Sequence, residues 1–264
     1  MSLVFAAIAP HPPILIPNVG KDHISKIEKT KQALEKIEQE LYSSRPDIVI
    51  VISPHGEIDP RAFTINLAND YEADFEHFGD FETKLKFKGD TVLMTFGKEK
   101  MSSKSQINII SDKRLDHGTS IPLYCLTRHL EQVSIIPIYF SMLDSQAHFE
   151  FGKGLKEIIM DSDKRIAVIA SADLSHCLSE NSPVKCDPAG KIFDQKIIKL
   201  IEDCDSLGIV NFDHELAEKA HECGLRSIQV LAGILSDVKC KPQILSYESP
   251  FGVGYAVVSI SMNY

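Results

Sequence analysis

The sequence predicts an α/β fold: a single three-layer domain in which a central, mostly parallel or mixed sheet carries helices on both faces. Several short runs are almost entirely apolar, such as DIVIVIS (47–53) and RIAVIAS (165–171), which is typical of strands covered on both faces. Segments with helical periodicity alternate with these runs. No Gly/Ser/Pro-rich linker divides the chain, so we expect residues 1–264 to form one domain.

The expected strands are, in chain order, 3–9, 47–53, 62–67, 134–140, 165–171, 243–247 and 254–260. The expected helices are 24–41, 145–160, 188–206 and 213–236, the last with Asp213 or Asn211 as its N-cap. In 24–41, for example, Ile and Leu recur at helical spacing while charged residues fill the other positions. The segment 68–90 is dense in Asp, Glu, Phe and Gly, and we expect it to be an excursion on the surface or over a site.

The composition excludes several classes of protein. With 44% hydrophobic and 25% charged residues, the chain is typical of globular proteins, and no apolar run reaches the roughly 20 residues of a membrane span. The net charge is −9 and the densest basic stretch, 97–106, is short, which argues against nucleic acid as a partner. Six cysteines without paired spacing, and no signal-peptide pattern, indicate free thiols and a cytoplasmic location.

Three histidines follow apolar, strand-like runs. His11 follows 3–9, His55 follows 47–53, and His176 comes shortly after 165–171. Ligands of open α/β sheets bind beyond the carboxyl ends of the strands, so we expect these imidazoles at one edge of the sheet. A single His after a strand is usually a turn residue, and the Pro before His11 and His55 also ends strand pairing. The joint placement of the three nevertheless favours a metal or catalytic site.

Other candidates have two open interpretations. His117, in LDHGTSIPL, is either a site residue or part of a helix N-terminus. Cys223, which precedes Gly224, is either a soft metal ligand or a small buried hydrophobic residue. Cys177 is adjacent to His176, and sequence neighbours rarely form a nucleophile–base pair. The remaining histidines lie in polar contexts and are given no role: His23, His77, His129, His148, His214 and His221. No Gly-rich phosphate loop is present, so we expect no organic cofactor.

Six fragments together resemble a known family. APHPP, SPHG, LDHGTSIPL, SADLSH, ECGLRS and YESPFGVGYAV occur in the order seen in the LigB-type class III extradiol ring-cleavage dioxygenases and their Memo-type relatives. The resemblance runs nearly end to end, and the chain is also similar to the Memo-like proteins that accompany radical-SAM proteins in bacteria. It implies a single α/β domain with the site at the strand ends and an oxidoreductase of aromatic compound metabolism.

The resemblance also implies roles for single residues. In the ring-cleaving members, two His and one carboxylate hold Fe(II) and leave positions open for a catecholate and O₂. By motif, His11 and His55 are the implied metal ligands. His176 is the implied acid/base toward the catechol, and His117 is implied to bind substrate or oxygen. Asp173 is implied to orient His176 or to contact the metal region.

The third metal ligand departs from the ring-cleaving pattern. In those enzymes the carboxylate comes from the region that HECGLRS resembles, and here Arg226 lies near that position. In the Memo-type branch a Cys-Gly pair supplies a thiolate, and Cys223 matches it. Glu222 and Glu248 are the alternative third ligands. Fe(II) is the expected metal, with Zn and Cu as alternatives.

The first functional hypothesis is therefore a non-haem iron, extradiol dioxygenase-like enzyme that cleaves a catecholic small molecule with O₂. The alternative is a Memo-like metal-binding or redox protein that acts in a multi-protein pathway, with a radical-SAM partner and without ring cleavage. A third hypothesis is zinc-dependent hydrolysis with His176 as the base. The substrate, the native metal and the formation of a homo-oligomer are left open.

Overall fold

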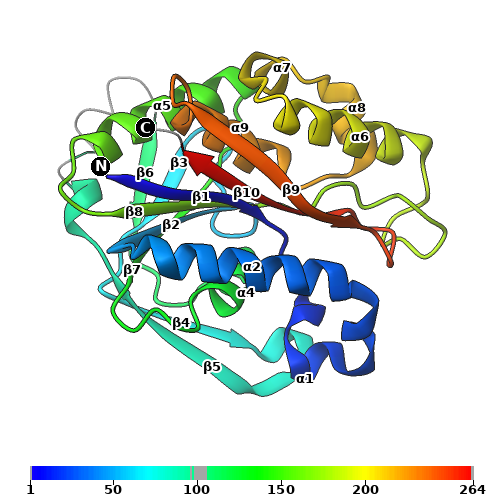
Figure 1. Ribbon diagram of the computed structural model, residues 1–264, viewed down its shortest axis with the longest axis horizontal. Helices are drawn as coiled ribbons and strands as arrows, with labels where there is room; N and C mark the ends of the chain where they lie inside the picture. The colour runs from blue at the N-terminus through cyan, green and yellow to red at the C-terminus, as the bar shows by residue number, and fades with distance from the viewer. Residues whose placement is uncertain (1, 96, 98–105, 263–264) are drawn as a thin grey trace.

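A mixed sheet of ten strands runs through the centre of the computed structural model, which describes residues 2–95, 97 and 106–262 (Figure 1). Helices cover both faces of this sheet, which confirms the predicted three-layer α/β fold. The extension of one domain over the whole of 1–264 stays a prediction. The basic stretch 97–106 lies outside the described residues, apart from its two ends.

The strands are β1 (Leu3–Ala9), β2 (Ile48–Ser53), β3 (Phe63–Asn66), β4 (Asp70–Phe75), β5 (Asp80–Gly89), β6 (Ile107–Ile110), β7 (Ser134–Tyr139), β8 (Ile166–Ser171), β9 (Cys240–Glu248) and β10 (Tyr255–Met262). Their order in the sheet is β4-β5-β7-β2-β8-β1-β10-β9, and β3 pairs with both β6 and β7. The central strands β7, β2, β8 and β1 are mutually parallel. Their carboxyl ends therefore lie at one edge, where the candidate histidines follow.

The helices are α1 (Pro17–Gly20), α2 (Glu28–Ser44), α4 (His117–Leu126), α5 (Ser145–Met160), α6 (Pro188–Glu202), α7 (Ser206–Val210), α8 (His214–Ala220) and α9 (Leu225–Ile234). Three short 3₁₀ segments are η1 (Pro13–Leu15), η2 (Lys21–Ile27) and η3 (Glu76–Phe78). In Figure 1, α2 and α4 lie on one face of the sheet, and α5 to α9 lie on the other. Within the described residues, none of these helices combines the length and apolar character needed to cross a bilayer.

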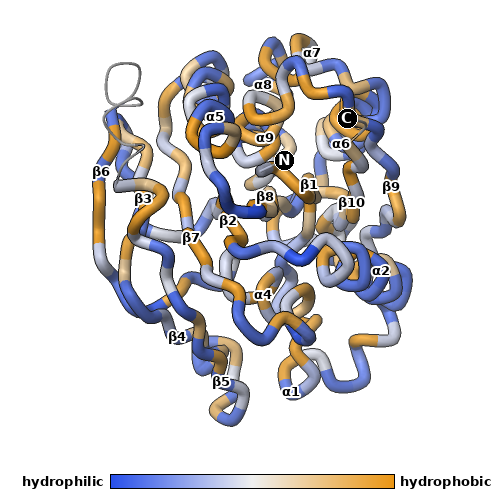
Figure 2. Tube along the Cα trace, turned by 60° about the vertical axis from the view of Figure 1, so that its left-hand side comes forward, coloured by the Kyte–Doolittle hydropathy of each residue, from blue (hydrophilic) through white to orange (hydrophobic). Residues whose placement is uncertain are grey.

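Two apolar layers, one on each face of the sheet, explain the nearly continuous hydrophobic runs. In β2, Val49 and Val51 pack in the layer with α2 and α4, while Ile50 and Ile52 pack in the layer with α5 and α9. Every residue of β2 is buried, so each position before the last one carries an apolar side chain. Figure 2 shows the contrast between hydrophobic β7 and the largely hydrophilic α2, whose outer face meets solvent.

The predicted helix 213–236 is wrong as a single element, because it is two helices, α8 and α9. Asp213 caps the first, as expected, by accepting a hydrogen bond from the N–H of Leu216. His221 then adopts a left-handed conformation (φ 51°), which ends α8. The apolar periodicity continues beyond this break, so the sequence pattern hides it. The loop 221–224 that results carries Cys223.

The expected helix 145–160 is confirmed as α5, whereas two other expected helices shift at their ends. The segment 188–206 stops being helical at Glu202 and is followed by the short α7, with Cys204 in a left-handed conformation between them (φ 52°). The segment 24–41 begins as the 3₁₀ segment η2 and becomes α-helical only at Glu28.

The segment 68–90, expected as an excursion on the surface or over a site, is an antiparallel ribbon of β4 and β5. Tyr71, Ala73 and Phe75 alternate along β4 and are buried, which gives the ribbon an apolar inner face. The 3₁₀ segment η3 forms its tip, and two residues of that tip line a pocket beside the candidate site. The part of the expectation that placed this segment over a site is thus met by its tip.

Candidate metal centre

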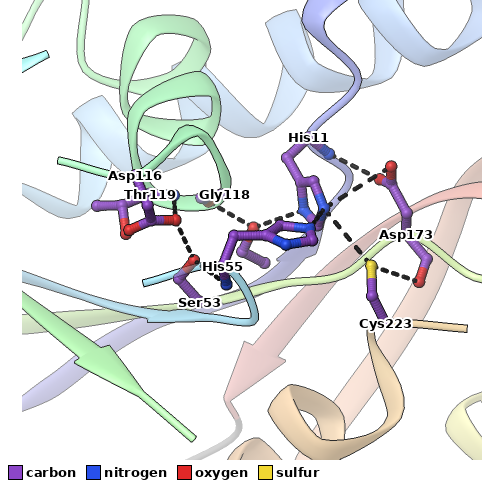
Figure 3. A network of polar contacts seen from close by, with 9 residues as sticks. His11, Ser53, His55, Asp116, Gly118, Thr119, Asp173 and Cys223 are labelled. Atoms are coloured by element: carbon purple, nitrogen blue, oxygen red, sulfur yellow. Dashed lines mark hydrogen bonds and ion pairs between the residues drawn. The ribbon is translucent and has the colours of Figure 1, made fainter. Parts of the chain in front are cut away.

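The two Pro-His pairs bring their imidazoles together at the edge of the sheet. β8 lies between β1 and β2, and all three strands are parallel. His11 follows β1 and His55 follows β2, each after a proline that ends the strand. The Nε2 atoms of the two rings are 3.0 Å apart (Figure 3). Two nitrogen ligands that each lie about 2.0–2.1 Å from one metal ion are separated by a similar distance.

The loop between α8 and α9 brings a sulfur atom to the same place. A Cβ on Gly224 would lie 2.5 Å from the Cβ of Ala172 and 2.8 Å from the carbonyl oxygen of Asp173, so only glycine allows this close approach. Its neighbour Cys223 places Sγ 3.5 Å from Nε2 of His11. The ligand atoms of His11, His55 and Cys223 all lie within 4.8 Å of one another. Imidazole and thiolate are donors that suit zinc, copper and iron.

Ser171, the last residue of β8, fixes the tautomer of His11. Its hydroxyl donates to the carbonyl oxygen of Gly118 (2.5 Å), so its oxygen is free to accept from Nδ1 of His11 (2.8 Å). The proton of the neutral ring is therefore on Nδ1, and Nε2 presents a lone pair toward His55 and Cys223. A metal ligand needs this arrangement, in which the distal nitrogen is held by a hydrogen bond and the proximal one is bare.

Asp173 contacts His11 rather than His176. Its Oδ1 accepts the backbone N–H of His11 (2.8 Å), and its Oδ2 lies 3.8 Å from Nε2 of the same residue. The carboxyl group is buried, and burial raises its pKa to about 6 against the opposing hydrogen bond from His11. Asp173 therefore contacts His11, a candidate metal ligand, whereas no hydrogen bond to His176 is found among the described residues.

His117 is the first residue of α4, as one of its two interpretations expects, and it also lies beside His55; its role as a site residue stays a prediction. Its ring stacks on that of His55, with centroids 4.1 Å apart and an interplanar angle of 23°. Asp116 caps α4 by accepting from the N–H of Thr119 (3.0 Å), and it also accepts from the hydroxyl of Ser53 at the end of β2 (2.5 Å). These bonds attach the start of α4 to the strand end that precedes His55.

His176 lies on the loop that follows β8. Its backbone N–H donates to the carbonyl oxygen of Ala220, at the end of α8 (3.0 Å). Its Nδ1 is buried and has no hydrogen-bond partner in the part of the chain that the structure describes. Its charge is the smallest of the causes that lower the pKa of both His11 and His55.

Burial keeps the imidazoles of the centre neutral. It is the largest cause of the lowered pKa of His11, His55 and His117, and the other imidazoles add repulsion at the first two. Burial raises the pKa of Cys223, and the charges of the nearby Asp173 and Glu222 raise it further. The thiol therefore stays protonated until a cation binds. A coordinated metal ion reverses this preference, because it deprotonates a thiol ligand.

The two alternative carboxylate ligands point elsewhere. Glu222 accepts the backbone N–H at the start of α9 (2.5 Å), and burial raises its pKa to about 7. Glu248 accepts two hydrogen bonds from Thr30, one from the backbone and one from the hydroxyl, both 2.7 Å long. Arg226 places its guanidinium 5.7 Å from the ring centroid of Phe140. Neither glutamate belongs to the three-donor cluster of the described residues.

A pocket of about 410 Å³ opens beside His55 and His117. The tip of the β4–β5 ribbon contributes His77 and Phe78 to its wall, and Tyr139, the last residue of β7, lines another side. Phe78 contacts His117 edge-on, with centroids 5.5 Å apart. The pocket size falls within the range of about 300–1,000 Å³ typical of small-molecule sites.

Sequence reasoning missed several of these residues. It gave no role to His77, and it did not single out Ser171, Asp116 or Phe78. A signal existed for Ser171, which is the polar residue that ends an otherwise apolar strand. No comparable signal exists for Phe78, because its position depends on the ribbon reaching the edge of the sheet. His148 is buried, with its ring nitrogens 2.8 Å and 3.1 Å from the carbonyl oxygens of Asp144 and Ser141, so it has a structural place in the core.

Comparison with known proteins gives two relatives with similar sequences. A protein of Clostridium acetobutylicum is 31% identical over 98% of this chain and 58% of its own length. A 4,5-DOPA dioxygenase extradiol of Beta vulgaris is 25% identical over 58% of each sequence. The chain thus spans somewhat over half the length of these relatives.

Among solved structures, an uncharacterized protein of Escherichia coli K12 superposes with a TM-score of 0.70. The match covers 98% of this chain and 100% of the other at 15% identity, a likeness of fold. Residues 5–258 match the family described as the catalytic LigB subunit of aromatic ring-opening dioxygenase. The chain therefore belongs to the LigB family.

Proposed function

We propose that this protein is a metal-dependent, extradiol dioxygenase-like oxidoreductase that cleaves a catecholic small molecule with O₂. Membership of the LigB family supports the reaction class, and the similarity to a 4,5-DOPA dioxygenase supports a vicinal diol as the substrate. The observation that carries the proposal is the bare Nε2 of His11, 3.0 Å from Nε2 of His55 and 3.5 Å from Sγ of Cys223.

The proposed ligands of the metal are His11, His55 and Cys223. Their chemistry fits a transition-metal ion, because two neutral imidazoles and one thiol converge where burial disfavours any positive charge on the rings. We expect Fe(II), with Zn and Cu as alternatives. If bound by these residues, Fe(II) would supply Lewis-acid and redox chemistry toward a vicinal diol and O₂.

The pocket beside His55 and His117 is the proposed substrate site. The Phe78 ring provides an apolar wall, and the β4–β5 tip that carries it partly covers the site from solvent. His117, held at the start of α4 and stacked on His55, can donate a hydrogen bond to the substrate or to oxygen. Stacking fixes the orientation of its ring, which reduces the entropy lost when substrate binds.

His176 is the proposed acid/base. Its buried Nδ1 has no hydrogen-bond partner among the described residues, so it is free to accept a proton from a diol hydroxyl. Asp173 is the proposed positioning residue, since its Oδ1 accepts the backbone N–H of His11 and so fixes the turn that carries this proposed ligand.

The test is turnover of catechols by the iron-loaded protein. The protein is loaded with Fe(II) without oxygen, its iron content is measured, and it is mixed with a panel of catechols before air is admitted. The proposal expects a coloured ring-opened product, formed with consumption of one O₂ per product. A His55→Ala variant is the matched control and should give none. A fully iron-loaded protein that consumes no O₂ with any catechol of the panel would contradict the proposal.

One observation favours a second function, a Memo-like metal-binding or redox protein without ring cleavage. The third donor of the cluster is the sulfur of Cys223, while Glu222 and Glu248 are bonded elsewhere. A thiol ligand changes how a metal reacts with O₂. This alternative includes action in a multi-protein pathway with the radical-SAM partner that the family resemblance implies.

The two functions share a ligand test. A Cys223→Ala variant should lose tight metal binding, while Cys186→Ala, which removes another partly exposed cysteine, should keep it. Metal retention by Cys223→Ala would show that sulfur is not a ligand. Asp173, with Oδ2 3.8 Å from Nε2 of His11, would then be the third donor to test. Metal binding that depends on Cys223, without O₂ consumption, favours the second function.

A further inference from the structure

Two free cysteines meet at a place unrelated to the metal centre. Cys204 follows α6 and Cys240 begins β9, yet their sulfur atoms are 3.9 Å apart. The thiol of Cys204 also lies 3.5 Å from the carbonyl oxygen of Cys240. Among the six cysteines, all of which lie in the described residues, Cys204 is the exposed one.

Strand register separates this pair from the metal centre. β1 is antiparallel to β10, which is antiparallel to β9, so β1 and β9 run in the same direction. Cys240 pairs with Met262, and Ile260, two residues earlier, pairs with Ala6 of β1. Cys240 therefore lies level with the start of β1, whereas His11 follows the end of that strand. The Cys204–Cys240 pair and the candidate metal centre therefore lie at opposite ends of the strands.

The backbone brings the two sulfur atoms together. Cys204 adopts a left-handed conformation (φ 52°), which turns the chain sharply between α6 and α7. Among the described residues β9 pairs with β10 alone, so it is an edge strand there, and α6 packs against it. Formation of an S–S bond of about 2.05 Å from this arrangement requires the two sulfur atoms to approach by about 1.9 Å, a distance that side-chain rotation can supply.

We propose that Cys204 and Cys240 form a redox-active dithiol that closes to an intramolecular disulfide by exchange with a low-molecular-weight disulfide. The Cys204 thiolate attacks one sulfur of R–S–S–R, which breaks that bond, forms a mixed disulfide and releases RS⁻. The Cys240 thiolate then attacks the Cys204 sulfur, forms the internal disulfide and releases the second RS⁻. The two cysteine protons end on two RSH, and the two electrons pass to the external disulfide.

The difference in exposure assigns the order of the two attacks. Cys204 is open to solvent and can meet an external disulfide, whereas Cys240 is half-buried. Burial is the main cause that raises the pKa of Cys240 to about 11, and the charge of the neighbouring Cys204 is the second. Conversion of Cys204 to a mixed disulfide removes that charge, so it eases ionisation of Cys240 at the step in which Cys240 must attack.

The disulfide would join two lining residues of a second pocket. Both cysteines line a pocket of about 270 Å³, which reaches between α9 and the sheet to Ile228, Leu231 and Ile8. A bond between them joins the α6–α7 turn to the edge strand across this pocket. The oxidised protein should therefore be more stable than the reduced one, by a rise in Tm of roughly 5–15 °C for a bridge that closes a loop of this length.

The test uses the full chain in buffers of reduced and oxidised glutathione, followed by alkylation of free thiols and mass spectrometry. The wild type should lose two hydrogens, retain no glutathione, and yield one cross-linked peptide pair that contains Cys204 and Cys240. Dithiothreitol should restore both thiols and reverse the rise in Tm. A wild type in which both cysteines remain alkylated at full glutathione oxidation would overturn the proposal, as would a disulfide between other cysteines.

Variants test the order of attack. Cys240→Ser should stop at the mixed disulfide and retain one glutathione on Cys204, while Cys204→Ser should retain none at this pair. Cys186→Ser is the control and should behave as the wild type, because Cys186 lies outside the pair. If a variant fails to fold by circular dichroism, the peptide map of the wild type still decides whether the disulfide forms. Glutathione found on Cys240 in the Cys204→Ser protein would contradict the assigned order.

Discussion

Ser171 Oγ lies 2.8 Å from Nδ1 of His11, and the same hydroxyl donates its proton to the carbonyl oxygen of Gly118, 2.5 Å away. One hydroxyl thus connects β8, the turn after β1 and the first turn of α4. Because its proton is used on Gly118, it can only accept from His11, and this decides which nitrogen of His11 faces the centre.

Loss of this hydroxyl should weaken the metal site. In Ser171→Ala the proton of His11 is free to move to Nε2, so we expect metal affinity to fall by about 10–100-fold. Competition with a chelator measures the affinity. Ser120→Ala is the matched control, since Ser120 is also buried and its Oγ has no partner within the described residues. Equal affinities in the two variants would show that Ser171 does not set the tautomer.

Replacement of His176 should separate proton transfer from metal binding. His176→Gln should lower kcat by about 10²–10⁴-fold, because the side chain can no longer accept the diol proton. Metal content should stay at the wild-type level, since His176 is outside the proposed ligand set. His214→Gln, which changes an exposed histidine on α8, should leave both kcat and metal content unchanged. A loss of metal together with activity would mean that His176 belongs to the ligands.

The ribbon tip should affect substrate binding more than the chemical step. Phe78→Ala removes the apolar wall beside His117, so we expect KM for a catechol to rise by about 10-fold or more with a smaller change in kcat. Phe81→Ala is the control on the same ribbon, where the side chain is 69% exposed, and it should have wild-type kinetics. Steady-state kinetics of the iron-loaded proteins measures both. An unchanged KM in Phe78→Ala would place the substrate elsewhere.

Asp194 should make stability depend on pH. It is buried on α6, where burial raises its pKa to about 6 against hydrogen bonds from Tyr247 (2.7 Å) and the N–H of Ser175 (2.9 Å). The folded-state pKa is above the unfolded value of about 3.9, so ionisation favours unfolding. The contribution of Asp194 to the free energy of unfolding is fully present below about pH 4 and is lost as pH rises through about 6.

The free energy of unfolding should fall by on the order of 3 kcal/mol between these two pH values because Asp194 ionises. Urea denaturation of wild type and Asp194→Asn from pH 4 to pH 7, both free of metal, measures it as the difference between two pH profiles. Titration of the other groups is common to both proteins and cancels. Parallel profiles would show that Asp194 keeps an ordinary pKa in the folded state.

The strand ends could be predicted because local chemistry determines them. A strand buried on both faces leaves a run of apolar residues, and Pro marks where pairing stops, so the positions of His11 and His55 follow from sequence. Parallel strands then bring those ends to one edge, and this geometry needs no further information.

The remaining parts depend on contacts that sequence patterns do not show. The break between α8 and α9 escaped prediction because apolar residues keep helical spacing on both sides of it. Gly224 is required there by the proximity of Ala172, which comes from a distant strand end. The role of Ser171 depends on the carbonyl of Gly118, 53 residues away. The meeting of Cys204 and Cys240 likewise depends on how α6 packs on β9.

The loop 221–224 has a consequence for how this architecture can be diversified. His11 and His55 directly follow strands of the sheet, where a change of position would disturb the core, whereas Cys223 lies on the loop 221–224, outside both α8 and α9. A substitution at position 223 therefore changes the third donor of the proposed metal centre without altering a residue of a helix or strand. In that proposal the redox character of the centre is a one-codon variable, which directed evolution can explore at constant fold.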